Sequence, residues 1–67
     1  MARKRVYIVP TDSALRAELA RKMVVIYTVR LNDGTEVDVC DAAYAQNDEI
    51  ANILDRYCEY AEVDTLE

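Results

Sequence analysis

The sequence predicts a small α+β domain whose elements follow the order β-α-β-β-α. A chain of 67 residues has material for only one hydrophobic core, so we expect one domain over residues 1–67. Its composition, 52% apolar and 31% charged, is typical of a globular protein. Runs of β-branched residues alternate with amphipathic helical patterns. We therefore expect a small three-stranded mixed sheet with both helices on one face.

The first strand is expected at about residues 3–9, where β-branched and aromatic residues precede Pro10. Thr11, Asp12 and Ser13 are then candidate N-caps of a helix over about residues 12–22. A helical crossover between two strands of one sheet is right-handed and makes them parallel, so the first and second strands are expected to be parallel.

The second and third strands are expected to form a hairpin over residues 23–31 and 35–40. A three-residue loop pairs Val29 with Val37 and Arg30 with Glu36, whereas a two-residue loop would mix apolar and polar partners. This loop also places Gly34 at the left-handed position of a G1 bulge. The side chains expected to face the core are Met23, Val25, Tyr27, Val29, Leu31, Val37 and Val39.

The second helix is expected at about residues 48–62, after a short turn at 42–46 and an Asn47 N-cap. Residues 63–67 are expected to form a loose tail. The apolar stripe of this helix would comprise Ile50, Ile53, Leu54, Tyr57, Cys58 and Ala61.

Composition argues against catalysis and against metal or cofactor binding. The chain has no His and a single Gly, so the usual proton shuttle and a glycine-rich phosphate loop are both missing. Cys40 and Cys58 cannot complete a zinc site, and whether they pair is left open, although free thiols are favoured in a reducing cytosol. We expect no catalytic residue, no metal site and no cofactor.

The segment that follows the basic N-terminus bears on localisation. Its apolar stretch ends at Pro10, which is too short for a signal peptide, and no apolar run approaches the ~20 residues of a membrane helix. A cytoplasmic protein without membrane contacts is therefore expected.

Charge is divided unevenly along the chain. Residues 1–30 carry a net charge of +5 and residues 31–67 a net charge of −10. A carboxylate row on the second helix, opposite its apolar stripe, would present negative charges at intervals comparable to those of nucleic-acid phosphates. Acids of the hairpin would extend this surface, and Tyr60 and Tyr44 would flank it as packing residues. The acidic surface comprises Asp48, Asp55, Glu59 and Glu62, extended by Glu36 and Asp38.

Short length, a single domain, missing catalytic groups and the carboxylate row together resemble small phage-encoded inhibitors of host defence, especially acidic anti-CRISPR proteins. The resemblance is one of overall profile. It implies a non-enzymatic DNA mimic, acting in the host cytoplasm as a monomer or weak dimer. Such a protein occupies the basic nucleic-acid-binding site of a larger protein complex without contacting nucleic acid itself.

Two other functions remain open. Arg3, Lys4 and Arg5 ahead of a capped helix resemble the opening of ribbon-helix-helix repressors, whose paired N-terminal strands read the DNA major groove. A small DNA-binding transcriptional regulator is therefore one alternative. The other is a dimerising accessory or structural module that self-associates through an exposed outer sheet face, formed by Val24, Ile26 and Cys40.

Overall fold

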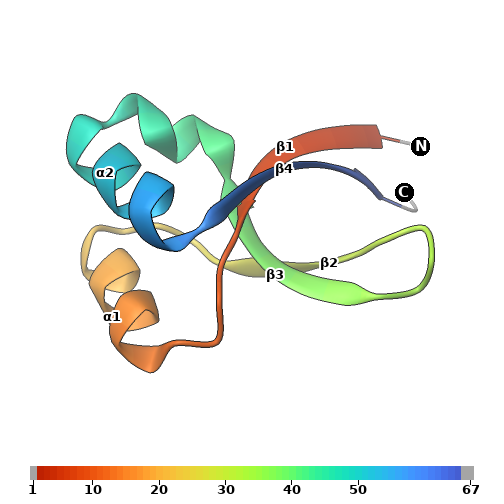
Figure 1. Cartoon of the computed structure of the whole chain (residues 1–67), viewed down its shortest axis with the longest axis horizontal. Coiled ribbons are helices and arrows are strands. Elements are labelled where there is room, and N and C mark those ends of the chain that lie inside the picture. The colour runs from red at the N-terminus through yellow and green to blue at the C-terminus, as the bar shows by residue number, and fades with distance from the viewer. Residues whose placement is uncertain (1, 66–67) are drawn as a thin grey trace.

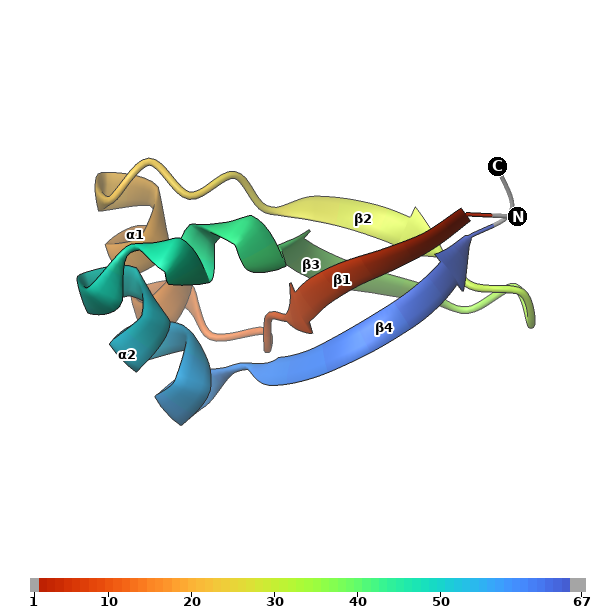
Figure 2. The same ribbon diagram turned by 90° about the horizontal axis from the view of Figure 1, so that it is seen from above.

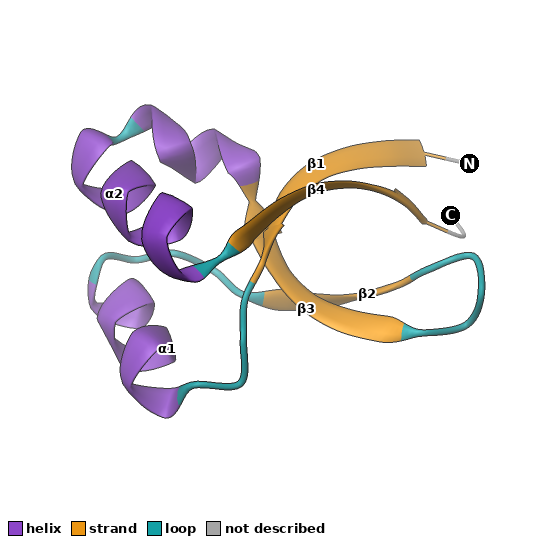
Figure 3. Ribbon diagram, in the orientation of Figure 1, coloured by secondary structure: helices purple, strands orange, loops and turns teal. Residues whose placement is uncertain are grey.

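The computed structural model of the protein describes residues 2–65 and confirms the α+β class. Two α-helices and a short 3-10 helix gather at one end of an antiparallel sheet, whose strands extend away from them (Figures 1 and 3). No helix in the described residues is long and apolar enough to cross a membrane. In chain order the elements are β1 (Ala2–Ile8), α1 (Ser13–Arg21), β2 (Tyr27–Arg30), β3 (Glu36–Asp41), η1 (Ala42–Gln46), α2 (Asp48–Tyr57) and β4 (Glu59–Thr65).

The sheet has four strands in the order β2-β3-β1-β4, and every neighbouring pair is antiparallel. The expected three-stranded mixed sheet was wrong in this respect. β2 does not lie beside β1, because β3 occupies that position, with Cys40 opposite Tyr7. The other side of β1 is paired along its whole length with β4, from Ala2 opposite Thr65 to Ile8 opposite Glu59. Figure 2 shows β1 between β3 and β4.

The hairpin turn and its register are confirmed. Val29 lies opposite Val37 and Arg30 opposite Glu36, as the matching of apolar with apolar residues predicted. The amide of Leu31 donates to the carbonyl of Thr35 at 2.7 Å, which closes the three-residue loop. Gly34 has φ of +89°, a conformation that residues with a β-carbon rarely adopt.

The hairpin begins later than expected, because residues 23–26 turn out of α1 instead of forming a strand. Met23 has φ of +64°, and its amide donates to the carbonyl of Ala20 at 3.0 Å. The amide of Val24 donates to the carbonyl of Leu19, also at 3.0 Å. These two bonds define a Schellman motif, with Met23 at the position that glycine usually occupies.

The last element is a strand where the sequence predicted the end of a helix. α2 ends at Tyr57, and Cys58 has extended backbone angles (φ −118°, ψ 158°). In β4 the side chains of Ala61 and Val63 point to one face of the sheet, and Tyr60 and Glu62 point to the other. The expected loose tail over 63–67 is wrong for residues 63–65, which belong to β4, while 66–67 lie outside the described residues.

The core consists of two clusters on opposite faces of the coiled sheet. The first packs both helices against the face that carries Tyr7 and Cys40. The second lies on the concave face of the curved sheet (Figure 1). There Lys4 of β1 lies over the ring of Tyr27 in β2, with Nζ 5.8 Å from the ring centre. The expected core face was therefore only partly right. The buried members of the first cluster are Tyr7, Val9, Leu15, Leu19, Val24, Cys40, Ile50 and Leu54. Those of the second are Val6, Val29, Val39 and Val63.

Candidate functional site

The predicted acidic row is divided between two elements. Asp48 and Asp55 lie on the same side of α2, about 10 Å apart along the helix axis. Glu59 and Glu62 belong to β4, where residues three apart point to opposite faces of the sheet. The prediction of one helical row of four carboxylates was therefore wrong.

Ion pairs join basic residues of the first half of the chain to acidic residues of the second half. Three carboxylates of the predicted surface, Glu36, Asp38 and Glu62, lie in such pairs, so their charge is balanced within the chain. The N–O distances are 3.3 Å for Arg3–Asp64, 3.8 Å for Arg3–Glu62, 2.9 Å for Arg16–Asp38, 3.0 Å for Lys22–Glu49 and 3.1 Å for Arg30–Glu36.

Asp38 has a structural role in particular. Its carboxylate accepts a 2.7 Å hydrogen bond from the hydroxyl of Thr28 and pairs with Arg16. These two contacts, that of Thr28 first, lower the pKa of Asp38. Arg16 also donates to the backbone carbonyls of Val9 and Pro10. The Asp38–Arg16 pair therefore ties α1 and the loop before it to β3.

Other carboxylates hold local backbone structure. Asp12 accepts from the Leu15 amide at 3.1 Å and is the N-cap of α1, as the sequence suggested. Asp41 caps η1 in the same way, and Asp33 accepts from the Thr35 amide inside the hairpin loop. Within residues 2–65, the acidic residues that have neither an ion pair nor such a backbone bond are Asp48, Asp55 and Glu59.

Asp55 belongs to a small cluster with two tyrosines. It accepts a hydrogen bond of 3.2 Å from the hydroxyl of Tyr7, and the rings of Tyr7 and Tyr60 meet edge to face with centres 5.5 Å apart. Burial, followed by the neighbouring Asp55 carboxylate, raises the pKa of Tyr7. The contact links the middle of the sheet to α2, and Tyr60, 48% exposed, is connected to Asp55 through Tyr7.

The other tyrosines differ in exposure from what the sequence indicated. The hydroxyl of Tyr44 accepts a hydrogen bond from the Val25 amide at 3.1 Å, and the ring packs against the first core cluster. Tyr44 therefore supports the loop after α1 and is only partly exposed. Tyr57 is 57% exposed, although it lies on the predicted apolar stripe. Tyr57 and Tyr60, rather than Tyr44, are the exposed tyrosines, and Tyr60 is connected to Asp55 through Tyr7.

The apolar patch predicted for self-association is buried. Val24 and Cys40 belong to the first core cluster, and Ile26 packs against it. They turn inward because both helices cover the face of the sheet that carries Cys40, and because residues 24–26 follow the Schellman turn. The exposed apolar residues of this segment are Met23 and Val25 instead.

The basic N-terminal residues lie in a strand that is paired along its whole length on one edge. Arg3 is bound to Asp64 and Glu62, and Lys4 covers the ring of Tyr27. Paired N-terminal strands from two copies, as in the ribbon-helix-helix resemblance, require a free strand edge. Here β4 pairs with one edge of β1 throughout, and β3 pairs with the other edge over Val6–Ile8, which leaves out Arg3, Lys4 and Arg5.

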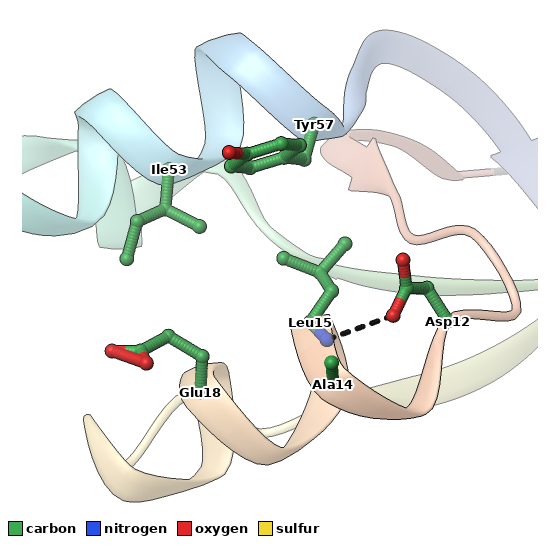
Figure 4. A pocket seen from close by; sticks show the side chains of 6 residues that line it. All are labelled: Asp12, Ala14, Leu15, Glu18, Ile53 and Tyr57. Atoms are coloured by element: carbon green, nitrogen blue, oxygen red, sulfur yellow. Dashed lines mark hydrogen bonds between the residues drawn. The ribbon is translucent and has the colours of Figure 1, made fainter.

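A groove of about 460 Å³ runs between α1 and α2 (Figure 4). Ile53 and Tyr57 form its α2 wall, and Ala14, Leu15 and Glu18 form its α1 wall. Asp12 lies at one end. Near the Glu18 end, Lys22 bridges the two helices by pairing with Glu18 at 3.7 Å and with Glu49 at 3.0 Å. Sequence reasoning missed this groove because Ile53 and Tyr57 were assigned to the interior.

Both cysteines are free thiols. Burial, with smaller effects of Cys58 and Asp41, raises the pKa of Cys40 to about 11, and burial also raises the pKa of Cys58. Both are therefore protonated near neutral pH and poorly nucleophilic. Within residues 2–65, no three His, Cys, Asp or Glu side chains are grouped closely enough to hold a metal ion.

Comparisons with protein-family models, with curated proteins and with solved structures found no match. Function is therefore inferred from the residues of this chain alone.

Proposed function

We propose that the protein is a non-enzymatic binding module that docks its α2 side on a basic surface of a larger protein. The observation that carries the proposal is the set of carboxylates left over after internal pairing. Asp48, Asp55 and Glu59 all lie on α2 or just after it, and Tyr57 and Tyr60 are exposed in the same part of the chain.

Electrostatics favours a basic partner over a nucleic acid. The chain carries a net charge of −5, so a polyanion would be repelled. The basic residues of the first half are largely engaged by the chain's own acids, as the pairing of Arg3 and Arg16 shows. A basic protein surface would instead be attracted, and the attraction would act mainly on the rate of association.

The exposed Tyr60 gives this surface a means of close contact. A tyrosine offers a large, rigid contact area and loses little conformational entropy on binding. Tyr60 is held in place by its edge contact with Tyr7, which in turn donates to Asp55. A preorganised ring on an acidic surface suits a lysine or arginine, because both aromatic faces and carboxylates attract a cation.

Where the basic surface is one that binds nucleic acid, the protein would compete with that nucleic acid and act as an inhibitor. This retains the inhibitory role implied by the anti-CRISPR resemblance, but with a smaller acidic surface. Glu36, Asp38 and Glu62 are left out of the proposed surface because each is paired with arginine in the chain itself.

The test compares two triple variants in binding a fluorescein-labelled peptide of about ten lysines at low salt. Asp48→Asn, Asp55→Asn and Glu59→Gln together remove the unpaired charges, and Asp55→Asn keeps an oxygen that can accept from Tyr7. The charge-matched control is Glu36→Gln, Glu49→Gln and Asp64→Asn, which changes the net charge equally at paired sites.

We expect the first triple variant to bind the lysine peptide about tenfold more weakly than the wild-type chain, and the control to change less than about threefold. Circular dichroism verifies that both variants remain folded. Equal weakening in the two variants would mean that only net charge matters, and the proposed surface would be rejected.

A further inference from the structure

The groove between α1 and α2 is a largely apolar surface that residues 2–65 leave uncovered. Leu15 forms part of it and is buried by the core beneath, whereas Ile53 is only partly buried and Tyr57 is largely exposed. The predicted apolar stripe of α2 therefore includes two residues, Ile53 and Tyr57, that the core does not bury fully. An apolar stripe that extends past the core is typical of a helix that contacts a further partner.

The polar residues of the groove lie at its two ends. At one end Glu18 is engaged by Arg21 and Lys22, and these contacts, that of Arg21 first, lower the pKa of Glu18. At the other end Asp12 uses one carboxylate oxygen to cap α1 at the Leu15 amide. Figure 4 shows its second oxygen directed toward the α2 wall, where the ring of Tyr57 lies.

Asp12 and Tyr57 together make this end suited to a cation. Within the described residues Asp12 has no ion pair, and a cation placed between its free oxygen and the Tyr57 ring would meet both a carboxylate and an aromatic face. An apolar side chain entering the middle of the groove would lie between Leu15 and Ile53. The groove is thus complementary to a segment that presents an apolar residue next to a basic one.

We propose that the groove binds a basic amphipathic helical segment of the partner. An apolar side chain of that segment inserts between Leu15 and Ile53, and a lysine or arginine one turn away lies between Asp12 and Tyr57. This inference rests on the proposed function, since it concerns the same basic partner, although the groove lies on the side of α2 opposite Asp48 and Asp55. The lining residues span Ala14–Glu18 on α1 and Ile53–Tyr57 on α2, about 6 Å along each helix axis, which matches one turn of a partner helix.

The experiment titrates the full ¹⁵N-labelled chain with an amphipathic Leu/Lys peptide of about 14 residues, followed by NMR chemical shifts. A peptide of the same composition, with its leucines spread around the helix, serves as the reference ligand. Ala14→Arg places a positive charge in the groove. Ala17→Arg is the matched control, because Ala17 is exposed on the same helix and does not line the groove.

We expect the amphipathic peptide to shift the amides of Leu15, Ile53 and Tyr57, and to bind at least about tenfold more weakly to the Ala14→Arg chain. Ala17→Arg should change binding less than about threefold, because its charge faces solvent and is screened. Binding of the permuted peptide should also be at least about tenfold weaker, since only the amphipathic order presents its apolar face to the groove.

The outcomes separate the groove from the acidic surface. If Ala14→Arg and Ala17→Arg weaken binding equally, or neither does, the groove is not the docking site. If binding is then still lost in the Asp48, Asp55 and Glu59 variant, the proposed function stands without the groove. If Ala14→Arg abolishes binding while the Asp48, Asp55 and Glu59 variant binds like the wild-type chain, the groove is supported and the α2 carboxylates are not part of the contact.

Discussion

Replacing Met23 with glycine should stabilise the fold. Met23 occupies the left-handed position of the Schellman motif after α1, with φ of +64°. For a residue with a β-carbon this conformation costs about 1–2 kcal/mol. Glycine removes that cost but loses about 0.5–1 kcal/mol through the greater freedom of its unfolded chain. Because the Met23 side chain is 83% exposed, little burial is lost, and the net gain is about 0.5–1 kcal/mol.

The gain can be measured by urea denaturation followed by circular dichroism. A stabilisation of this size raises the midpoint of thermal unfolding by about 2–8 °C in a domain of this length. The urea midpoint should rise without a change in slope, because the surface exposed on unfolding is unaltered.

Two further variants isolate the role of the backbone angle. Met23→Ala removes the exposed side chain but keeps the β-carbon, so it should bring no comparable gain. Ala20→Gly places a glycine on the exposed side of the same helix end, where φ is right-handed, and should cost about 0.5–1 kcal/mol. The reasoning is refuted if Met23→Ala stabilises as much as Met23→Gly, or if Met23→Gly destabilises the chain.

Two more predictions concern titratable groups. The pKa of Asp38 is lowered by Thr28 and Arg16, so its contribution to stability is present above the unfolded-state pKa of about 4 and is lost as the pH falls further. Asp38→Asn should therefore lower stability at pH 7 and flatten the loss of stability in acid, measured by urea denaturation from pH 7 to 2.5, and an unchanged acid slope would count against this role. The raised thiol pKa values predict slow labelling of the native chain by Ellman's reagent at pH 8, with the partly exposed Cys58 reacting before the buried Cys40. In a Cys58→Ser variant the remaining thiol should react only as fast as the chain unfolds, and labelling at the rate of a free thiol would show that Cys40 is accessible.

Local sequence rules succeeded where one segment decides its own structure. Pairing Val29 with Val37 distinguishes one hairpin register from the next, because a shift of one residue exchanges the faces of the strand. The caps were equally local, since Asp12 and Asn47 bond to amides within three residues. The helix over 12–22 and the turn at 42–46 were therefore well placed.

The wrong predictions concern segments whose secondary structure depends on residues far away in the sequence or on an unusual backbone angle. The residues after Tyr57 fit both a helical stripe and a strand with Ala61 and Val63 on one side, and only β1, more than fifty residues earlier, favours the strand. The start of the hairpin was misplaced for a related reason. Met23 adopts the left-handed conformation that is usually expected only of glycine, so a methionine at this position does not indicate the end of a helix.

The candidate site was less predictable than the fold, because pairing between the two halves of the chain decides which charges remain. The division into a basic first half and an acidic second half suggested that the charges serve to bind partners. In the folded chain much of it serves internal pairing, with Arg3 opposite Asp64 and Arg30 opposite Glu36. Exposed pairs of this kind contribute only about 0–1 kcal/mol each, so their main effect is to favour one strand pairing over others. The acids that this pairing does not use therefore indicate the partner surface better than the sequence total does.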